Sequence, residues 1–175
     1  IGAAESMGIK ACVINNKADL NWCSPNYTKI LDTYRKLGYP TIDCSAKKKS
    51  NLKAIMTLLQ DEMTIFVGQS GVGKSSLINV IALESNQLTQ EISTKKNEGR
   101  HTTVNSSILN LKFGGKVMDS PGVRDYSPII DTAYQVAGSF IEIEAEGANC
   151  KYHNCQHIKE NTCAVKVAVD EERID

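Results

Sequence analysis

Apolar and polar positions along the chain follow two patterns, one typical of buried strands and one typical of helices. Short apolar runs predict strands over residues 12–15, 41–44, 63–67, 108–113 and 116–118. Apolar residues at helical spacing predict helices over residues 27–37 and 52–59, and from residue 75 to residue 83. This order of strands and helices predicts the α/β class, with a mainly parallel sheet and helices on both of its faces. A ligand is then expected outside the carboxyl ends of the strands.

The pattern changes near Ile141, beyond which the strand signal fades and polar, cysteine and histidine residues become frequent. We therefore expect a larger domain over residues 1–140 and a small, mostly helical domain over residues 141–175. Gly114 and Gly115 separate the last two predicted strands and predict a hairpin turn. Because the sequence starts at Ile1 and not at a methionine, we expect it to be a piece of a longer protein.

Composition is ordinary for a soluble globular protein, with 41% hydrophobic and 23% charged residues among 175. The formal net charge of zero excludes a global basic field of the kind that attracts nucleic acid. No apolar run approaches the roughly 20 residues of a membrane-spanning helix, so no membrane partner is expected. The lysine runs at residues 47–49 and 95–96 are interpreted as solvated loops. Cys12 and Cys44 lie in apolar runs, and we expect both to be small buried residues.

The stretch from Gly68 to Ser75 reads GQSGVGKS and fits the pattern G-x-x-x-x-G-K-[ST] of a phosphate-binding loop. It follows a predicted strand and opens a predicted helix, which is the context that this motif requires. Lys74 is expected to contact the β- and γ-phosphates and Ser75 to bind Mg²⁺. The predicted nucleotide contacts of this stretch are Gly68, Gln69, Ser70, Gly71, Val72, Gly73, Lys74, Ser75 and Ser76. The alternative is a glycine-rich turn in an unrelated α/β protein.

A second motif, NKAD, ends the first predicted strand and resembles the base-reading box of GTP-binding proteins. Asp19 can accept hydrogen bonds from N1–H and N2–H of guanine together, a pair that adenine cannot offer. Asn16 can reach N7, and the stem of Lys17 can lie along the base. Ser45 and Ala46 end the next predicted strand and resemble the second base-contact loop of GTPases. The alternative is an ATP-using enzyme in which NKAD occurs by chance.

The order of these two motifs is the reverse of that in most GTP-binding proteins, where the base-reading box lies downstream of the phosphate loop. No NKxD occurs after Lys74, and no room remains before Asn16 for another phosphate loop. A circularly permuted P-loop GTPase domain accounts for both observations. The alternative, a truncated tandem of two GTPase domains, leaves both halves incomplete.

Further downstream, VMDSPG resembles the D-x-x-G box of GTPases. Asp119 would hold Mg²⁺ through a water, and the N–H of Gly122 would sense the γ-phosphate. Thr102 and Thr103 are candidates for the threonine that closes over Mg²⁺, and the choice between them stays open. The polar residues 89–100 predict a switch loop that the triphosphate orders.

The residue after the D-x-x-G glycine is Val123, where many GTPases carry a glutamine that orients the attacking water. Valine has no hydrogen-bonding group, so slow intrinsic hydrolysis of GTP is predicted. His101 is the nearby group that can position water, and it is a candidate catalytic residue beside Lys74, Thr102 and Thr103. Its alternative is a histidine in a surface loop.

Three cysteines and a histidine gather near the C-terminus in the pattern C-x4-C-x-H-x5-C. No secretory signal is present, so we expect a reducing compartment in which the cluster binds metal instead of forming disulfides. Cys150, Cys155, His157 and Cys163 suit a closed, tetrahedral and structural Zn²⁺ site that supplies folding energy. His153 is the rival fourth ligand, and separately packed reduced cysteines are the alternative to a metal site.

Together these motifs resemble the RsgA (YjeQ) family of circularly permuted ribosome-assembly GTPases. The matching stretches occur in the order of the family: NKAD, GQSGVGKSSLIN, GRHTT, DSPGVRDY and the cysteine–histidine set followed by AVKVAV. The resemblance implies an N-terminal OB-fold, which lies outside this chain, then the permuted GTPase domain and a zinc-binding helical domain that is truncated here. It implies a factor that acts in late maturation of the small ribosomal subunit, and a GTPase activity of this factor that the subunit stimulates. It also implies that the factor acts in the cytoplasm of a bacterium or in an organelle.

The expected function is hydrolysis of GTP to GDP and phosphate, with Mg²⁺ accompanying the nucleotide and Zn²⁺ as a structural cofactor. The expected partners are GTP or GDP and the small ribosomal subunit with its rRNA, and the chain is expected to be a monomer. The alternative is a binding module in which GTP and GDP switch the affinity for an RNA–protein particle and turnover is incidental.

Overall fold

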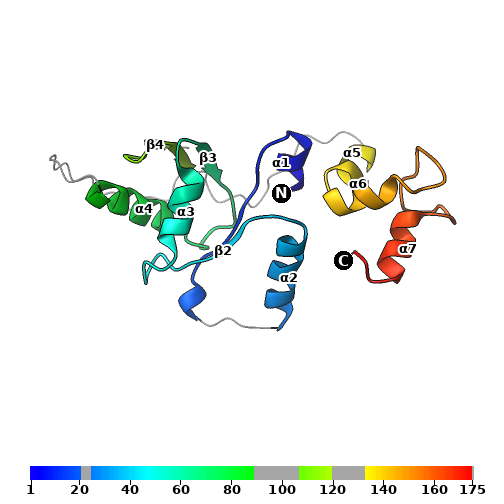
Figure 1. Cartoon of the computed structure of the whole chain (residues 1–175), viewed down its shortest axis with the longest axis horizontal. Coiled ribbons are helices and arrows are strands. Elements are labelled where there is room, and N and C mark those ends of the chain that lie inside the picture. Colours follow the sequence, from blue (N-terminus) through cyan, green and yellow to red (C-terminus); the bar gives the residue numbers. More distant parts are fainter. Residues whose placement is uncertain (21–24, 89–106, 120–132, 175) are drawn as a thin grey trace. The chain divides into compact units, whose positions relative to one another are not determined.

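The computed structural model describes residues 1–20, 25–88, 107–119 and 133–174 of the chain (Figure 1). The chain groups into two units, which are described in turn. Unit 1 comprises Ile1–Val13, Cys23–Thr41 and Ser127–Asp175, and unit 2 comprises Ile14–Trp22 and Ile42–Tyr126. The expected division into residues 1–140 and 141–175 stays a prediction. Among the described helices, none combines the length and the apolar character needed to cross a bilayer.

Unit 2 holds the strands and helices that surround the predicted nucleotide segments. Its elements are the 3-10 helix η1 (Ala18–Leu20), α3 (Leu52–Leu59), β3 (Met63–Phe66), α4 (Lys74–Leu88), β4 (Ser107–Asn110) and β5 (Lys116–Asp119). Two short strands, β1 (Val13–Asn15) and β2 (Thr41–Asp43), pair with each other and lead into this unit. The predicted elements are present, although α4 continues beyond residue 83 to Leu88 and β4 ends earlier than expected, at Asn110.

The larger sheet has the strand order β3–β5–β4. β3 and β5 run parallel, with Phe66 opposite Asp119, whereas β4 runs antiparallel to β5. The antiparallel pair closes through the predicted hairpin turn, where Gly114 and Gly115 have φ angles of +94° and +91°. Glycine adopts positive φ without the steric cost that other residues incur. The α/β class is confirmed, and the described sheet is mixed because this hairpin contributes an antiparallel strand.

The core of unit 2 lies between this sheet and two helices. All four apolar residues that predicted α3 are buried, namely Leu52, Ile55, Met56 and Leu59. They belong to one cluster with Phe66 and Val117 of the sheet and with Leu77, Ile78 and Ile81 of α4. Burial of each such side chain contributes about 1.5–3 kcal/mol to folding. The cluster therefore holds β3 and α4 in place, and with them the loop that connects the two.

Unit 1 is mostly helical in its described residues. Its helices are α1 (Gly2–Ser6), α2 (Pro25–Lys36), α5 (Ala133–Gly138), α6 (Ile141–Gly147) and α7 (Ala164–Asp170). The apolar pattern predicted α2 but neither α1 nor α5, because helices of 5 and 6 residues are too short to show a repeating apolar face. A small buried cluster of Cys155, Cys163 and Val165 lies where α7 begins.

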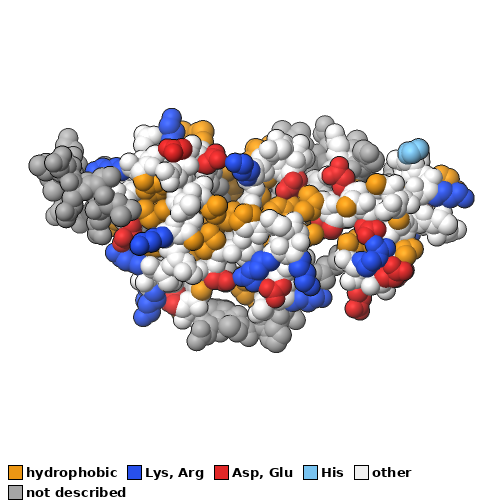
Figure 2. Space-filling view, viewed as in Figure 1, with side chains coloured by type: hydrophobic (Ala, Val, Ile, Leu, Met, Phe, Trp, Pro, Cys, Tyr) orange, Lys and Arg blue, Asp and Glu red, His pale blue; other side chains and the backbone are white. Residues whose placement is uncertain are grey.

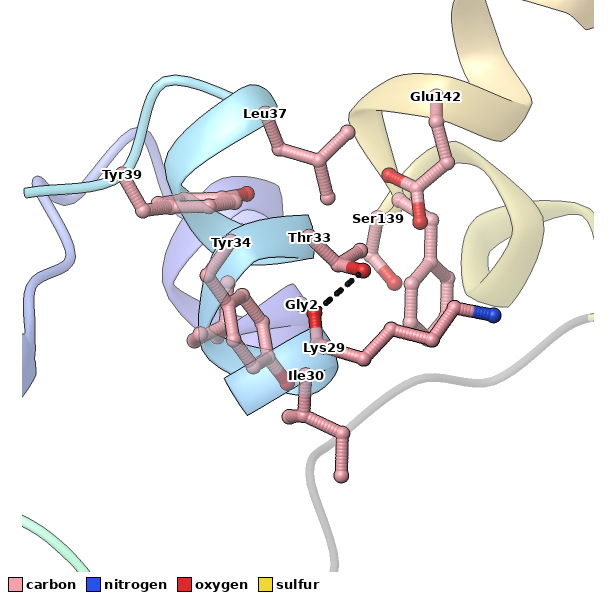
Figure 3. Close-up of a pocket in the computed structure, with 11 residues that line it drawn as sticks. Gly2, Lys29, Ile30, Thr33, Tyr34, Leu37, Tyr39, Ser139 and Glu142 are labelled. Carbon is pink, nitrogen blue, oxygen red and sulfur yellow. Dashed lines mark hydrogen bonds between the residues drawn. The ribbon is translucent and has the colours of Figure 1, made fainter. Parts of the chain in front are cut away.

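Unit 1 also contains a hollow of about 300 Å³, whose lining is drawn in Figure 3. Ile30, Tyr34 and Leu37 line it from α2 and the residue just after it, and Phe140 and Glu142 line it from the start of α6. No residue predicted to bind nucleotide or metal is part of this lining. The hollow is therefore separate from the predicted sites.

The isolated cysteines differ in exposure. Cys44 has an exposed fraction of 0% and belongs to the core of unit 2, as expected. Cys12 is exposed, so the prediction that it is buried is wrong. Because Cys12 precedes β1 and does not belong to it, the side-chain alternation of the strand does not turn its thiol inward.

Charged side chains of both signs are interspersed on the face drawn in Figure 2, in keeping with a net charge of zero. Lys47, Lys48 and Lys49 are exposed, as expected for a solvated loop. Lys49 pairs with Glu84 on α4, with 2.8 Å between Nζ and Oε1. An exposed pair of this kind contributes little to stability, at most about 1 kcal/mol.

Candidate functional site

The segment between β3 and α4 has the geometry expected of a phosphate-binding loop. Gly68 follows the strand closely, and α4 begins directly after Gly73. Gly71 and Gly73 have φ angles of +81° and +94°, which direct backbone N–H groups in a way that side-chain-bearing residues rarely allow. Loops of this shape, ending at a helix N-terminus, concentrate N–H donors and bind anions. Gln69, Ser70 and Val72 complete the loop.

Lys74 is held against this loop. Its Nζ donates hydrogen bonds to the carbonyl oxygens of Gly68, at 2.8 Å, and of Gln69, at 3.0 Å. Ser75 and Ser76 follow in the first turn of α4. The structure thus places one ammonium and two hydroxyl-bearing residues where the phosphates of a nucleotide are expected.

The NKAD segment touches the phosphate loop directly. Asn16 donates from Nδ2 to the carbonyl oxygen of Val72 at 3.0 Å, across a separation of 56 residues in the sequence. Lys17 donates from Nζ to the carbonyl oxygen of Gly71 at 2.6 Å. Both segments lie in unit 2. The structure therefore brings the predicted base-reading and phosphate-binding segments together in one place.

Asp19 lies in η1, and its carboxylate accepts a hydrogen bond from the predicted second base-contact loop. Ser45, which is fully buried, donates from Oγ to Asp19 Oδ1 at 2.6 Å, and the N–H of Lys48 donates to the same Ser45 oxygen at 3.0 Å. The hydrogen bond from Ser45, helped by the charges of Lys47 and Lys48, lowers the pKa of Asp19. Asp19 is therefore an ionised acceptor at neutral pH, as recognition of two guanine N–H donors requires.

Asn16 is oriented by more groups than the sequence indicated. The N–H of Ala46 donates to its Oδ1 at 3.1 Å, which links the two base-contact segments. The Cys44 thiol donates to the same Oδ1 at 3.8 Å between sulfur and oxygen. Burial, followed by the nearby charge of Asp43, raises the pKa of Cys44 to about 11, so the thiol keeps its proton. The apolar run around Cys44 predicts only a packing role for this residue, whereas its place directly before Ser45 is the signal for a contact with the base-contact segments.

Ser75 and Asp119, the residues predicted to hold Mg²⁺, lie in direct contact. The Oγ of Ser75 donates to Oδ2 of Asp119 at 2.7 Å. The pairing of β3 with β5 sets Asp119 opposite Phe66, at the strand end from which the phosphate loop departs. Oδ1 of Asp119 is buried without a hydrogen-bond partner in the part of the chain that the structure describes. A buried, unsatisfied carboxylate oxygen beside a hydroxyl fits Mg²⁺, which prefers oxygen ligands.

Several predicted residues lie outside the described residues. They are His101, Thr102, Thr103, Gly122 and Val123, together with the polar segment over residues 89–100. Their roles stay predictions, and so does the choice between the two threonines as the Mg²⁺ ligand.

Replacement of Gly73 by alanine is expected to weaken guanine recognition. A Cβ atom at this position would lie 2.5 Å from Nδ2 of Asn16, so the Asn16 amide would have to move away from the loop carbonyls. We expect Gly73→Ala to bind GDP about 10-fold or more weakly, since one oriented hydrogen bond contributes about 1 kcal/mol and positive φ adds strain of about 1–2 kcal/mol. Titration with fluorescent GDP and ADP analogues measures both the affinity and the preference for guanine.

The matched control is Gly71→Ala. Gly71 also has positive φ, but a Cβ atom there would meet nothing within 4 Å. Gly71→Ala should therefore weaken GDP and ADP alike, whereas Gly73→Ala should also lose part of the preference for GDP. Equal preferences in the two variants would contradict the role given to the contact between Gly73 and Asn16.

The four predicted metal ligands of unit 1 lie together. The ligand atoms of Cys150, Cys155, His157 and Cys163 are all within 4.8 Å of one another. Cys155 and Cys163 are buried. The rival ligand, His153, is not part of this group.

The spacing of the His157 nitrogen and two of the cysteine sulfur atoms fits a tetrahedral zinc centre. His157 Nδ1 lies 3.6 Å from Cys150 Sγ and 3.3 Å from Cys163 Sγ, and the two sulfur atoms are 3.9 Å apart. Zinc at about 2.3 Å from sulfur and about 2.0 Å from nitrogen sets tetrahedral ligands roughly 3.5–3.8 Å apart. Three thiolates and one imidazole are a donor set that zinc favours, and four protein ligands leave no position open for a substrate. The geometry therefore suits a structural metal.

A family model and several known proteins match most of this chain. The family model described as RsgA GTPase matches residues 1–128. The Small ribosomal subunit biogenesis GTPase RsgA of Histophilus somni (strain 2336) is 40% identical over 174 residues, which are 98% of this chain and 49% of that protein. The protein of the same name from Shewanella oneidensis is 38% identical, again over 98% of this chain and 49% of its own length. The chain thus spans about half the length of these relatives.

Solved structures give the same result. The crystal structure of YjeQ from Thermotoga maritima superposes with a TM-score of 0.75 at 27% identity, over 99% of this chain and 57% of that one. The crystal structure of YloQ, described as a circularly permuted GTPase, superposes with a TM-score of 0.74 at 27% identity, over 99% and 56%. The family model and the relatives match most of the chain, and its base and phosphate segments occur in the reversed order of a circularly permuted GTPase. The chain therefore belongs to the RsgA GTPase family.

Proposed function

We propose that this chain binds GTP and GDP with Mg²⁺ and hydrolyses GTP to GDP and phosphate. The observation that carries the proposal is the direct contact of NKAD with the phosphate loop, made by Asn16 with Val72 and by Lys17 with Gly71. This contact supports the proposal, because a single nucleotide requires base-recognition groups beside phosphate-binding groups. The name that the relatives carry, small ribosomal subunit biogenesis GTPase, supports the same activity.

Selectivity for guanine rests on Asp19 in this proposal. The hydrogen bond from Ser45 keeps its carboxylate ionised and oriented, so that both oxygens can accept from N1–H and N2–H of guanine. Adenine offers a different set of donors and acceptors at these positions. A wrong base would leave the carboxylate without partners, which is why such a pocket discriminates strongly.

The phosphates interact with the loop and with α4. Lys74 contacts the β- and γ-phosphates, and its ammonium stabilises the negative charge that develops as water attacks the γ-phosphorus in line. Ser75 and Asp119 would hold Mg²⁺, with the Ser75 hydroxyl and the Asp119 carboxylate supplying the oxygen groups that this ion prefers. When bound, Mg²⁺ neutralises charge on the β- and γ-phosphate oxygens. The fixed positions of these groups are supported by the hydrogen bonds of Lys74 and Ser75.

The remaining roles rest on sequence order alone. His101 would position the attacking water, Thr102 or Thr103 would be a further ligand of Mg²⁺, and the N–H of Gly122 would contact the γ-phosphate. Val123 stands where a glutamine would orient the water, so intrinsic turnover is slow and a partner must stimulate it.

We further propose that the partner is the small ribosomal subunit with its rRNA and that Zn²⁺ is held by the cluster of unit 1. Relatives from bacteria carry the subunit in their name, and this supports action in the cytoplasm of a bacterium. Action as a monomer is part of the same proposal.

Addition of small ribosomal subunits is expected to raise the rate of GTP hydrolysis by the purified chain at least about 10-fold. Replacement of Lys74 by alanine should lower the stimulated rate about 100-fold, because one positioned charge at developing negative charge is worth about 3 kcal/mol. Release of phosphate under single-turnover conditions measures both effects.

Lys53→Ala is the matched control, since Lys53 is an exposed lysine on α3 of the same unit. It should keep the stimulated rate of the unchanged chain. A rate that stays flat when subunits are added would overturn the proposal and favour a module in which nucleotide only switches affinity.

A further inference from the structure

The residues between the last two ligands of the metal cluster include a carboxylate with an unusual set of partners. Glu160 accepts a hydrogen bond from the backbone N–H of Gln156 on Oε1, at 3.0 Å. On Oε2 it accepts from the backbone N–H groups of Ile158 and Lys159, each at 3.0 Å. Three N–H groups of one short loop therefore point at a single side chain, and the ligand His157 lies in the middle of that loop.

The backbone at His157 explains why these N–H groups converge. His157 has a φ angle of +61°, in the left-handed region that side-chain-bearing residues seldom adopt. A change of backbone handedness within a few residues turns consecutive N–H groups toward one side and forms a cavity suited to an anion. Such a conformation persists only where the surroundings hold it. In this loop, the carboxylate of Glu160 fills the place of the anion.

The charge of Glu160 strengthens this arrangement. Hydrogen bonds from the backbone, that of Gln156 first, lower the pKa of Glu160 to about 2. The side chain is therefore a carboxylate at neutral pH, and its bonds to N–H donors are charge-assisted. The main chain of Glu160 is fixed as well, because Lys166 of α7 donates from Nζ to its carbonyl oxygen at 3.3 Å. Glu160 thus ties the loop of His157 to the helix that begins after Cys163.

We propose that Glu160 is a positioning residue of the metal centre, which holds His157 with its Nδ1 facing the cysteine sulfur atoms. The inference rests on the zinc site proposed above. Glu160 is not one of the four grouped ligands, and both of its oxygens are engaged by backbone donors. It acts on the metal through the backbone of its neighbour, by holding His157 in the ligand geometry of the folded, metal-bound loop.

The test compares the zinc affinity of the unchanged chain with that of Glu160→Gln, in competition with a chromophoric chelator. The glutamine keeps the size and one acceptor oxygen but loses the charge and the second oxygen. We expect the variant to bind zinc about 10–100-fold more weakly, as is usual when a group that orients a metal ligand is removed. Glu144→Gln is the matched control, an exposed glutamate of α6 in the same unit, and should bind zinc like the unchanged chain.

A second readout separates positioning from general stability. The absorption of Co²⁺ in the site reports its ligands, and Glu160→Gln should shift that spectrum toward the spectrum of His157→Ala. In the His157→Ala background, the further change Glu160→Gln should weaken zinc binding by less than about 2-fold, because residues that act through one another are not additive. Far-UV circular dichroism of the zinc-loaded variants shows that they are folded.

Three outcomes would count against the inference. Equal zinc affinity of Glu160→Gln and the unchanged chain overturns it and leaves the zinc site standing. If the losses of zinc affinity caused by Glu160→Gln and by His157→Ala add fully in the double variant, Glu160 does not act through His157 and the inference is overturned. Absence of zinc binding by the unchanged chain removes both the zinc site and the inference.

Discussion

An Asp19→Asn variant is expected to exchange its preferred nucleotide from GTP to XTP. Xanthine carries an oxygen where guanine carries the N2 amino group, so an asparagine amide can donate to that oxygen and still accept from N1–H. Toward GTP the variant loses two charge-assisted hydrogen bonds, each worth about 1.5–3 kcal/mol, which predicts an affinity at least about 100-fold lower. Competition of GTP, XTP and ATP against a fluorescent nucleotide measures the exchange.

The Asp19→Asn variant keeps its hydrogen bond with Ser45, because the Ser45 hydroxyl can still donate to the amide oxygen of the asparagine. The test therefore changes the contact with the base and keeps this support of the side chain. Asp32→Asn is the matched control, a half-exposed aspartate of α2 whose side chain pairs with Arg35 at 2.7 Å. It should leave all three affinities unchanged. If Asp19→Asn weakened GTP and XTP equally, Asp19 would hold the fold and would not read the base.

Loss of the metal is expected to unfold the segment that carries the cysteine–histidine cluster. The buried core there is small, with Cys155, Cys163 and Val165 as its buried members. α6 and α7 have 7 residues each, too few for a helix to persist in water without tertiary support. Zinc binding in small domains supplies an apparent 10–16 kcal/mol of folding energy, so Cys163→Ser or a strong chelator should remove most of this structure. Hydrogen exchange of the α6 and α7 amides measures the loss.

Cys12→Ser is the control for this experiment, since Cys12 is exposed and lies outside the metal cluster. It should keep the protection of the α6 and α7 amides and the full zinc content. Unchanged protection of those amides after complete removal of zinc would contradict a structural role for the metal.

The nucleotide site shows why a permuted order of segments is compatible with one pocket. Its groups follow the carboxyl ends of strands: Asn16 follows β1, Ser45 follows β2, the loop starting at Gly68 follows β3, and Asp119 ends β5. The carboxyl ends of strands in an open α/β sheet form the common binding edge. Recognition depends on which strand end a group follows and not on the order in which the chain visits the strands.

The sequence predicted the parts of this site that depend on local chemistry. Glycine spacing predicted the turns at Gly71 and Gly73, and the buried face of α3 followed from the spacing of Leu52, Ile55, Met56 and Leu59. These predictions succeed because backbone preference and apolar spacing act over a few residues. The prediction for Cys12 failed because an apolar run does not show where its strand begins.

By itself, the sequence determined the kinds of chemistry available: a phosphate loop, a carboxylate suited to guanine, and four ligands suited to zinc. Only the tertiary structure decided which groups meet. The bonds from Asn16 to Val72, from Ser45 to Asp19 and from Ser75 to Asp119 join residues far apart in the chain. Strand pairing and core packing set such distances, and these depend on the whole chain at once, whereas a motif depends on a few neighbouring residues.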